Sequence, residues 1–194
     1  MKMNLNKMIR SNVGFILCCI LVLSLFVSTD AKTFVLKSLL KTGLYSPDVD
    51  SAPNTGMDAS ALSFKSLDGR IINLSEEKGK VIFINFWTTW CPPCRAEMPS
   101  INSLYEKVGK NSNVLFLMVD ADNKLVQANK FMKKRSFQLP VFGAVSPIPE
   151  QIFAGALPTT LIISPRGEIV FRHEGIANYD SQKLISFIRG LLAN

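Results

Sequence analysis

The sequence has few histidines and cysteines, since its 194 residues include one histidine and four cysteines. Cys18 and Cys19 are adjacent, whereas Cys91 and Cys94 are separated by two residues. Because no other cysteine is available, a disulfide framework is excluded and the second pair must act by itself. A structural zinc site needs about four ligands. No such set is evident, so we predict no metal site and expect His173 to be structural or exposed.

A long hydrophobic run is also missing. The longest apolar stretch, residues 13–27, has 15 residues, whereas a membrane-spanning helix needs about 20. Basic residues precede this stretch, and small residues at positions 28–31 offer a cleavage site. The pattern predicts an export signal over residues 1–31, either cleaved or kept as an anchor in the inner membrane. The rest of the chain is then expected in the periplasm or another extracytoplasmic space.

Acidic residues are outnumbered, with 15 against 22 lysines and arginines, which gives a formal net charge of +7. The positive charges are interspersed, and their one cluster, residues 133–135, is typical of a solvated helix face. We therefore expect no nucleic-acid partner.

The segment from residue 32 to residue 60 divides into two parts. Residues 33–45 alternate leucines with lysines, which predicts a short amphipathic helix that ends at Gly43. This helix is expected to pack on the domain, and the alternative is a contact with a membrane surface. Residues 46–60 are rich in Pro, Asp, Ser, Asn and Gly and are predicted to be a linker.

Residues 61–194 have the pattern of one α/β domain. Two runs of apolar residues around Asp68-Gly69 predict a β-hairpin at its start. The other predicted strands are residues 81–86, 114–119 and 140–142, an apolar strand within 156–163 that has Pro158 at its start, and 168–172. The predicted helices are 93–108, 124–135 and 181–192. This order predicts a mixed central sheet with helices on both faces, in which the first two buried strands are parallel.

The most informative stretch is Trp90-Cys91-Pro92-Pro93-Cys94, which directly follows the most apolar predicted strand. Two prolines suit the first turn of a helix, where a missing N–H costs little. Cys91 is then expected just before a helix N-terminus, with Cys94 one turn inside. Unpaired N–H groups at that end stabilise an anion, and thiols in such motifs have pKa values of about 3.5–7.5.

These residues resemble the thioredoxin superfamily, and within it the TlpA/ResA/DsbE-like exported thiol-disulfide oxidoreductases. The resemblance covers about residues 61–193 and rests on the stretch from Phe86 to Pro99 and on Leu157-Pro158-Thr159-Thr160. It implies a thioredoxin-like fold with an N-terminal β-hairpin extension. It also implies that Cys91 is the nucleophile and Cys94 the resolving thiol, joined as a redox-active disulfide with no other cofactor.

The resemblance assigns further residues. Pro158 matches the family's cis-proline beside the dithiol, and Glu97 matches a glutamate that is spaced to take the proton of Cys94. Trp90, Pro92, Pro93 and Leu157 are expected, with Pro158, to bind the client protein. Two further expectations come from the residues themselves: Trp87 belongs to the core and Arg95 points to solvent. Asn85 is a departure, because thioredoxins carry a buried Asp at that position.

The function implied is that of an exported reductase of specific protein disulfides, for example in cytochrome c maturation. Its partners would be client proteins with disulfides and a membrane-bound thiol reductant, and the N-terminal segment could tether it to the membrane. Two alternatives stay open at this point. One is a disulfide oxidase or isomerase, and the other is a redox-inert thioredoxin-fold binding module or metal chaperone.

Overall fold

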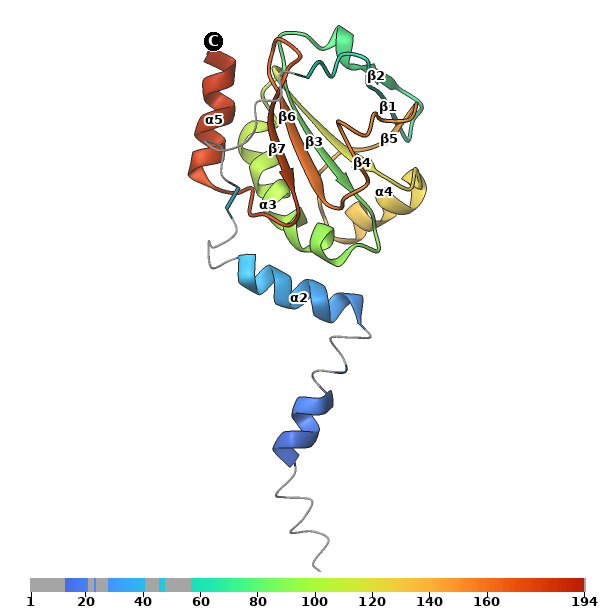
Figure 1. The fold of residues 1–194 in the computed structure, drawn as a ribbon, viewed down its shortest axis with the longest axis vertical. Coiled ribbons are helices and arrows are strands. Elements are labelled where there is room, and N and C mark those ends of the chain that lie inside the picture. The colour runs from blue at the N-terminus through green and yellow to red at the C-terminus, as the bar shows by residue number, and fades with distance from the viewer. Residues whose placement is uncertain (1–12, 21–22, 24–27, 41–45, 48–56, 194) are drawn as a thin grey trace, which may run out of the picture.

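The computed structural model describes residues 13–20, 23, 28–40, 46–47 and 57–193. Its centre is a seven-stranded sheet in the order β2-β1-β5-β4-β3-β6-β7 (Figure 1). The strands are β1 (Ser63–Ser66), β2 (Ile71–Asn73), β3 (Val81–Trp87), β4 (Val114–Asp120), β5 (Val141–Ala144), β6 (Thr159–Ile163) and β7 (Ile169–Glu174). From residue 28 onward, the helices of the described residues are α2 (Thr29–Leu40), η1 (Leu74–Glu76), α3 (Pro92–Val108), α4 (Leu125–Lys134) and α5 (Gln182–Ala193).

The sheet is mixed, as predicted. Strand β3 pairs in parallel with β4 and antiparallel with β6, and the predicted hairpin is formed by β1 and β2 with Gly69 at a positive φ in the turn. All seven residues of β3 are buried, because its β-branched and aromatic side chains are covered on both faces. The thioredoxin-like fold with an N-terminal hairpin is therefore confirmed.

Helices flank the sheet as predicted, but they are divided unequally between its two faces. Buried side chains of α3, α4 and α5 join one core cluster with alternate residues of β3, among them Phe83 and Trp87. The other cluster contains Ile84 and Phe86 and is covered by η1 and by residues 57–62 and 148–153. The reason is the strand order β3-β4-β5, since two successive right-handed crossovers in one direction place both helices on the same face.

Helix α2 lies against α3, so the predicted packing of the amphipathic segment on the domain is confirmed (Figure 1). It begins four residues before the predicted start, because the Ser28 hydroxyl accepts a hydrogen bond from the Ala31 N–H and caps the helix. The boundary predicted at residue 31 thus falls inside a helix. Residues 41–45, with the predicted stop at Gly43, and most of the predicted linker lie outside the described residues.

Most of the predicted export signal also lies outside the described residues. Residues 13–20 are helical and exposed, and both Cys18 and Cys19 are free thiols there. Among the residues that the structure describes, no helix is both long enough and apolar enough to cross a membrane. The export signal and its cleavage stay predictions.

Candidate active site

The two motif cysteines form a disulfide at the N-terminus of α3. Cys91 is the N-cap residue, and Pro92 and Pro93 occupy the first two helical positions, as the sequence predicts. Because neither proline has an N–H, the first amide of the helix belongs to Cys94, and it donates to Cys91 Sγ at 3.2 Å. The same N–H would stabilise a thiolate on Cys91 once the disulfide is reduced.

The disulfide lies among residues of unequal exposure. Cys91 and Cys94 are buried, Pro92 and Pro93 are half-buried, and Trp90 is 58% exposed. The indole Nε1 of Trp90 donates to Asp122 Oδ2 at 2.9 Å, which holds the ring on the loop after β4.

The cis-proline predicted from the family pattern is present, because the Leu157–Pro158 peptide bond is cis. Pro158 is buried at the start of β6, and Leu157 is half-buried and packs against both core clusters. Because β6 lies between β3 and β7, a proline would not be expected within it. Pro158 accordingly stands directly before the first residue of the strand, Thr159.

Glu97 is completely buried in the second turn of α3, three residues after Cys94 and on the same side of the helix. Its Oε1 accepts a hydrogen bond from Asn85 Nδ2 at 2.8 Å, and its Oε2 accepts one from the Ala177 N–H at 3.3 Å. Burial raises the pKa of this carboxyl well above its usual value, and the two hydrogen bonds oppose that shift in part. Glu97 is therefore not an ordinary surface glutamate.

Sequence reasoning missed the network around Glu97. The sequence comparison showed only that Asn85 stands where thioredoxins have an aspartate. In the structure, Asn85 Nδ2 donates to both Glu97 Oε1 and Thr160 Oγ1, at 2.8 Å and 2.9 Å. The one available signal was an amide within an otherwise apolar strand, because a buried amide needs partners. Its partners lie 12 and 75 residues away along the chain, so only the tertiary fold identifies them.

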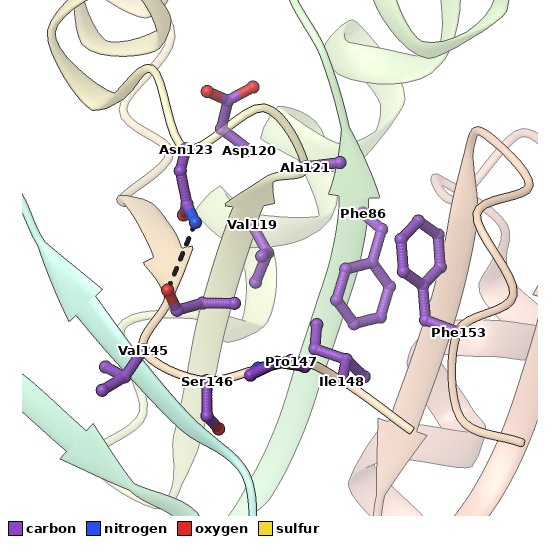
Figure 2. A pocket seen from close by; sticks show the side chains of 11 residues that line it. Phe86, Val119, Asp120, Ala121, Asn123, Val145, Ser146, Pro147, Ile148 and Phe153 are labelled. Atoms are coloured by element: carbon purple, nitrogen blue, oxygen red, sulfur yellow. Dashed lines mark hydrogen bonds between the residues drawn. The ribbon is translucent and has the colours of Figure 1, made fainter. Parts of the chain in front are cut away.

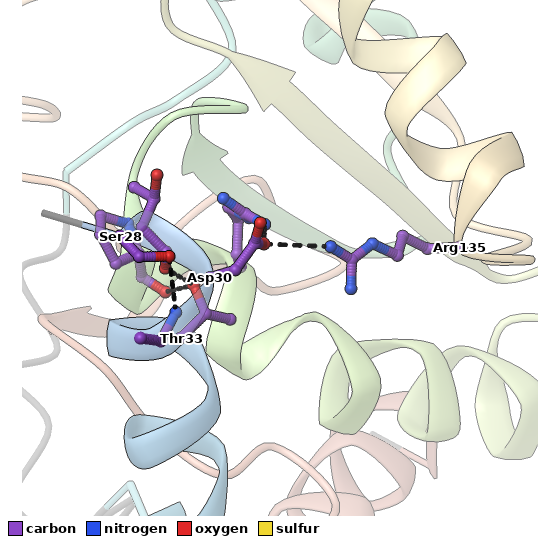
Figure 3. A network of polar contacts seen from close by, with 8 residues as sticks. Ser28, Asp30, Thr33 and Arg135 are labelled. Carbon is purple, nitrogen blue, oxygen red and sulfur yellow. Dashed lines mark hydrogen bonds and ion pairs between the residues drawn. The ribbon is translucent and has the colours of Figure 1, made fainter. Parts of the chain in front are cut away.

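The expectation that Arg95 points to solvent is wrong. Its side chain is 10% exposed and forms an ion pair with Asp30 of α2, which also contacts Arg135 (Figure 3). Its guanidinium also lies over the ring of Phe131, 5.7 Å from the centroid. Thr33 Oγ1 donates to the carbonyl of Pro92 at 3.5 Å, so α2 contacts the segment between the two cysteines. Trp87, by contrast, is a core residue as predicted.

A cavity of about 410 Å³ lies on the opposite face of the sheet, at the ends of β3, β4 and β5 (Figure 2). Phe86 and Phe153 stack along one side of it with their centroids 4.3 Å apart. Asn123 has a positive φ, and its side chain donates to the carbonyl of Ala144 at 3.4 Å. The cavity does not include the disulfide or Glu97.

Comparisons with known proteins agree with this geometry. A model of the Redoxin family matches residues 49–183. The thiol-disulfide oxidoreductase ResA of Bacillus cereus strain ZK is 36% identical over 116 residues, which are 59% of this chain and 66% of that protein. ResA of Halalkalibacterium halodurans is 33% identical over 126 residues, which are 64% and 71% of the two chains. The matched region thus spans just under two thirds of the first relative.

Solved structures show the same fold. A protein described as the thiol:disulfide interchange protein DsbE of Chlorobium tepidum matches with a TM-score of 0.58 and 25% identity, over 70% of this chain and 96% of that one. StoA of Bacillus subtilis matches with a TM-score of 0.52 and 22% identity, over 67% and 99%. The fold and the dithiol place the chain in the thioredoxin superfamily, among proteins similar to ResA and DsbE. More narrowly, the chain belongs to the Redoxin family.

Proposed function

We propose that the chain is an exported thiol-disulfide oxidoreductase that reduces specific protein disulfides. The observation that carries this proposal is the Cys91–Cys94 disulfide at the N-terminus of α3, with the Cys94 N–H directed at Cys91 Sγ. The similarity to ResA supports it. Cys91 would be the nucleophile, because its sulfur is the one that the helix N-terminus stabilises as an anion.

The reaction has two exchange steps. The Cys91 thiolate attacks one sulfur of a client disulfide, which forms a mixed disulfide and releases the other client sulfur as a thiolate. Cys94 then loses its proton and attacks Cys91 Sγ, which releases the second client sulfur and forms the Cys91–Cys94 disulfide. The client gains two electrons and the dithiol loses two, so a thiol reductant, proposed to be a membrane protein, must reduce the disulfide again.

Glu97 is the proposed base for the second step. The Cys94 side chain is buried, and Glu97 lies one turn further along the same side of α3. Because its raised pKa brings it closer to that of a thiol, the carboxylate is better matched to accept the Cys94 proton than an exposed glutamate would be.

The proposed client surface surrounds the disulfide. It consists of Trp90, Pro92, Pro93, Leu157 and Pro158, and its support is the exposure of Trp90 together with the half-burial of Pro92, Pro93 and Leu157. Extracytoplasmic location and a membrane tether are proposed from the predicted export signal. Apocytochrome c is one candidate client.

The test is to trap the client. In the variant Cys94→Ser the second step cannot occur, so the mixed disulfide on Cys91 should accumulate in the native cell and can be identified by mass spectrometry. The reduction potential decides the direction of electron flow. A value toward about −270 mV supports a reductase, whereas one near about −120 mV indicates an oxidase. Copper retention without any disulfide exchange would instead favour a metal chaperone.

A further inference from the structure

The burial of Glu97 raises a question that the exchange chemistry does not answer. Until the disulfide is reduced again and Cys94 can take its proton back, a proton on this carboxyl can exchange with water only through neighbouring groups, because the side chain has no exposed surface. Both of its oxygens already accept hydrogen bonds, from Asn85 Nδ2 and from the Ala177 N–H. Neither of these donors is a group that can carry a proton away, because amide N–H groups do not titrate in this range.

Polar side chains lead away from Glu97 in a row across the sheet. Asn85 of β3 pairs with Thr160 of β6, and Thr160 pairs with His173 of β7. Residues directly opposite each other on antiparallel strands share a face, so all three lie on the face covered by α3. Asn85 Nδ2 donates to Thr160 Oγ1 at 2.9 Å, and His173 is half-buried toward the edge of the sheet.

Tyr179 lies beside this row. The residue is completely buried, its ring meets Phe83 edge-on at 5.6 Å, and its N–H donates to Ser100 Oγ at 3.1 Å. Burial raises the pKa of the Tyr179 hydroxyl, the charge of Glu97 raises it further, and the neighbouring Thr160 hydroxyl lowers it. The contacts place Tyr179 beside the row, because Ala177, two residues earlier, donates to Glu97 Oε2, and Phe83 lies two residues before Asn85 on the same face of β3.

Three buried atoms of this group have no hydrogen-bond partner within the described part of the chain: Asn85 Oδ1, Tyr179 Oη and His173 Nε2. Their chemistry is complementary, since the amide oxygen accepts, the hydroxyl both donates and accepts, and a neutral imidazole accepts at Nε2 when Nδ1 carries the proton. Buried polar atoms of this kind are normally joined directly or by an internal water molecule.

We propose that Tyr179, Thr160 and His173 form a proton exit route for Glu97, an inference that rests on the proposed role of Glu97 as a base. The protonated carboxyl gives its proton to the hydroxyl pair, and a hydroxyl proton passes to His173 Nε2. The imidazolium then releases one proton to solvent, so the route holds as many protons after the transfer as before it. No electrons move in this step.

The ionisable groups next to Glu97 and His173, the two ends of the proposed route, are as follows. Glu97 faces Tyr179, and Cys94 lies on the same side of its own helix. At the other end, burial lowers the pKa of His173, while the backbone of Ile176 and the charge of Glu174 raise it. A lowered pKa keeps the imidazole mostly neutral near pH 7, which leaves Nε2 free to accept a proton, and it favours the release of that proton afterwards.

The experiment measures proton exchange on Glu97 itself. In the oxidised full-length protein labelled with ¹³C at glutamate Cδ, the Glu97 signal is recorded by NMR at pH values around its titration midpoint. Fast exchange gives one averaged signal, which we expect in the wild type. Tyr179→Phe, His173→Gln and Thr160→Val should each slow the exchange by about 100-fold, the low end for a positioned proton-transfer group. The signal should then broaden or split.

Matched variants separate transfer from packing. Thr160→Ser keeps a hydroxyl and should restore the averaged signal, and Tyr105→Phe makes the same atomic change on a half-buried tyrosine of α3 outside the row. An averaged signal that persists in both Tyr179→Phe and His173→Gln would overturn the route, as would two separate signals in the wild type. The readout needs no catalysis, so a protein that fails to reduce disulfides would refute the proposed function and leave this test intact.

Discussion

The two faces of strand β3 contrast sharply. Ile84 and Phe86 pack into a core cluster of apolar residues, and the face ends in the cavity of Figure 2. On the other face, Asn85 lies between aromatic residues and holds the buried carboxyl of Glu97. Burying a polar group costs free energy unless it is hydrogen-bonded. The contrast teaches that the fold accepts this cost for a carboxyl directly behind the disulfide, where a titratable group is useful.

The largest expected effect is on the chemical face. Cys91→Ser should abolish disulfide exchange, because the other thiol at this end of α3, Cys94, is completely buried. The measurement is reduction of insulin by the protein with dithiothreitol as the electron source. Cys18→Ser is the matched control, since Cys18 is exposed on the helix of residues 13–20 and should not matter. Exchange activity in Cys91→Ser would contradict the assignment.

On the opposite face the expected effect is on stability alone. Phe86→Ala removes a buried ring that stacks on Phe153 and should lower the free energy of unfolding by about 3–5 kcal/mol. Urea denaturation measures the loss, and Phe86→Leu should cost less. The exchange rate of the molecules that remain folded should not change. A lost exchange rate in a folded Phe86→Ala protein would erase the contrast between the faces.

Glu97→Gln should slow the attack of Cys94 on the mixed disulfide by about 100-fold, because a positioned base contributes at least about that factor. Stopped-flow release of thionitrobenzoate from Cys91 measures this step. Glu106→Gln on the exposed side of the same helix is the control. Equal rates for Glu97→Gln and the wild type across the pH range would remove Glu97 from the mechanism.

The buried carboxyl also predicts how stability depends on pH. Because the pKa of Glu97 is raised in the folded state, the folded protein binds more protons than the unfolded chain above the ordinary value of 4.5. Its contribution to stability is thus present below that value and is lost as pH rises toward the folded-state pKa. The slope can reach about 1.4 kcal/mol per pH unit. Urea midpoints of the oxidised protein should show this slope, and Glu97→Gln should lack it.

The smallest expected effect concerns the ion pair between α2 and α3. Asp30→Asn removes the charge that meets Arg95 and Arg135, so α2 should open more often. Hydrogen exchange should become faster for the amides of α2 and stay unchanged for those of β3. Lys107→Gln is a comparison on the far end of α3, where the pair with Asp180 does not involve α2. Unchanged exchange in α2 would show that packing alone holds the helix.

Local patterns predicted what depends on neighbours in the chain. The apolar run of β3, the two prolines before Cys94 and the Asp68-Gly69 turn each specify a conformation within a few residues. The common face of α3, α4 and α5 was not predictable in this way, because it follows from the order of the strands. The same holds for the ion pair of Asp30 with Arg95, 65 residues apart, and for the bond of Asn85 to Thr160.

Cleavage of the predicted export segment would change the charges that α2 presents to α3, because Asp30 of α2 pairs with Arg95 of α3. A peptidase cut after Ala31 would remove Asp30 and the Ser28 cap, and the new chain would start at Lys32. Its terminal amino group, with a pKa of about 7.7–8.0, would put a positive charge close to where a carboxylate now meets Arg95. Maturation would in that case exchange attraction for repulsion at this contact. The packing of α2 against α3 therefore depends on whether the export segment is cleaved.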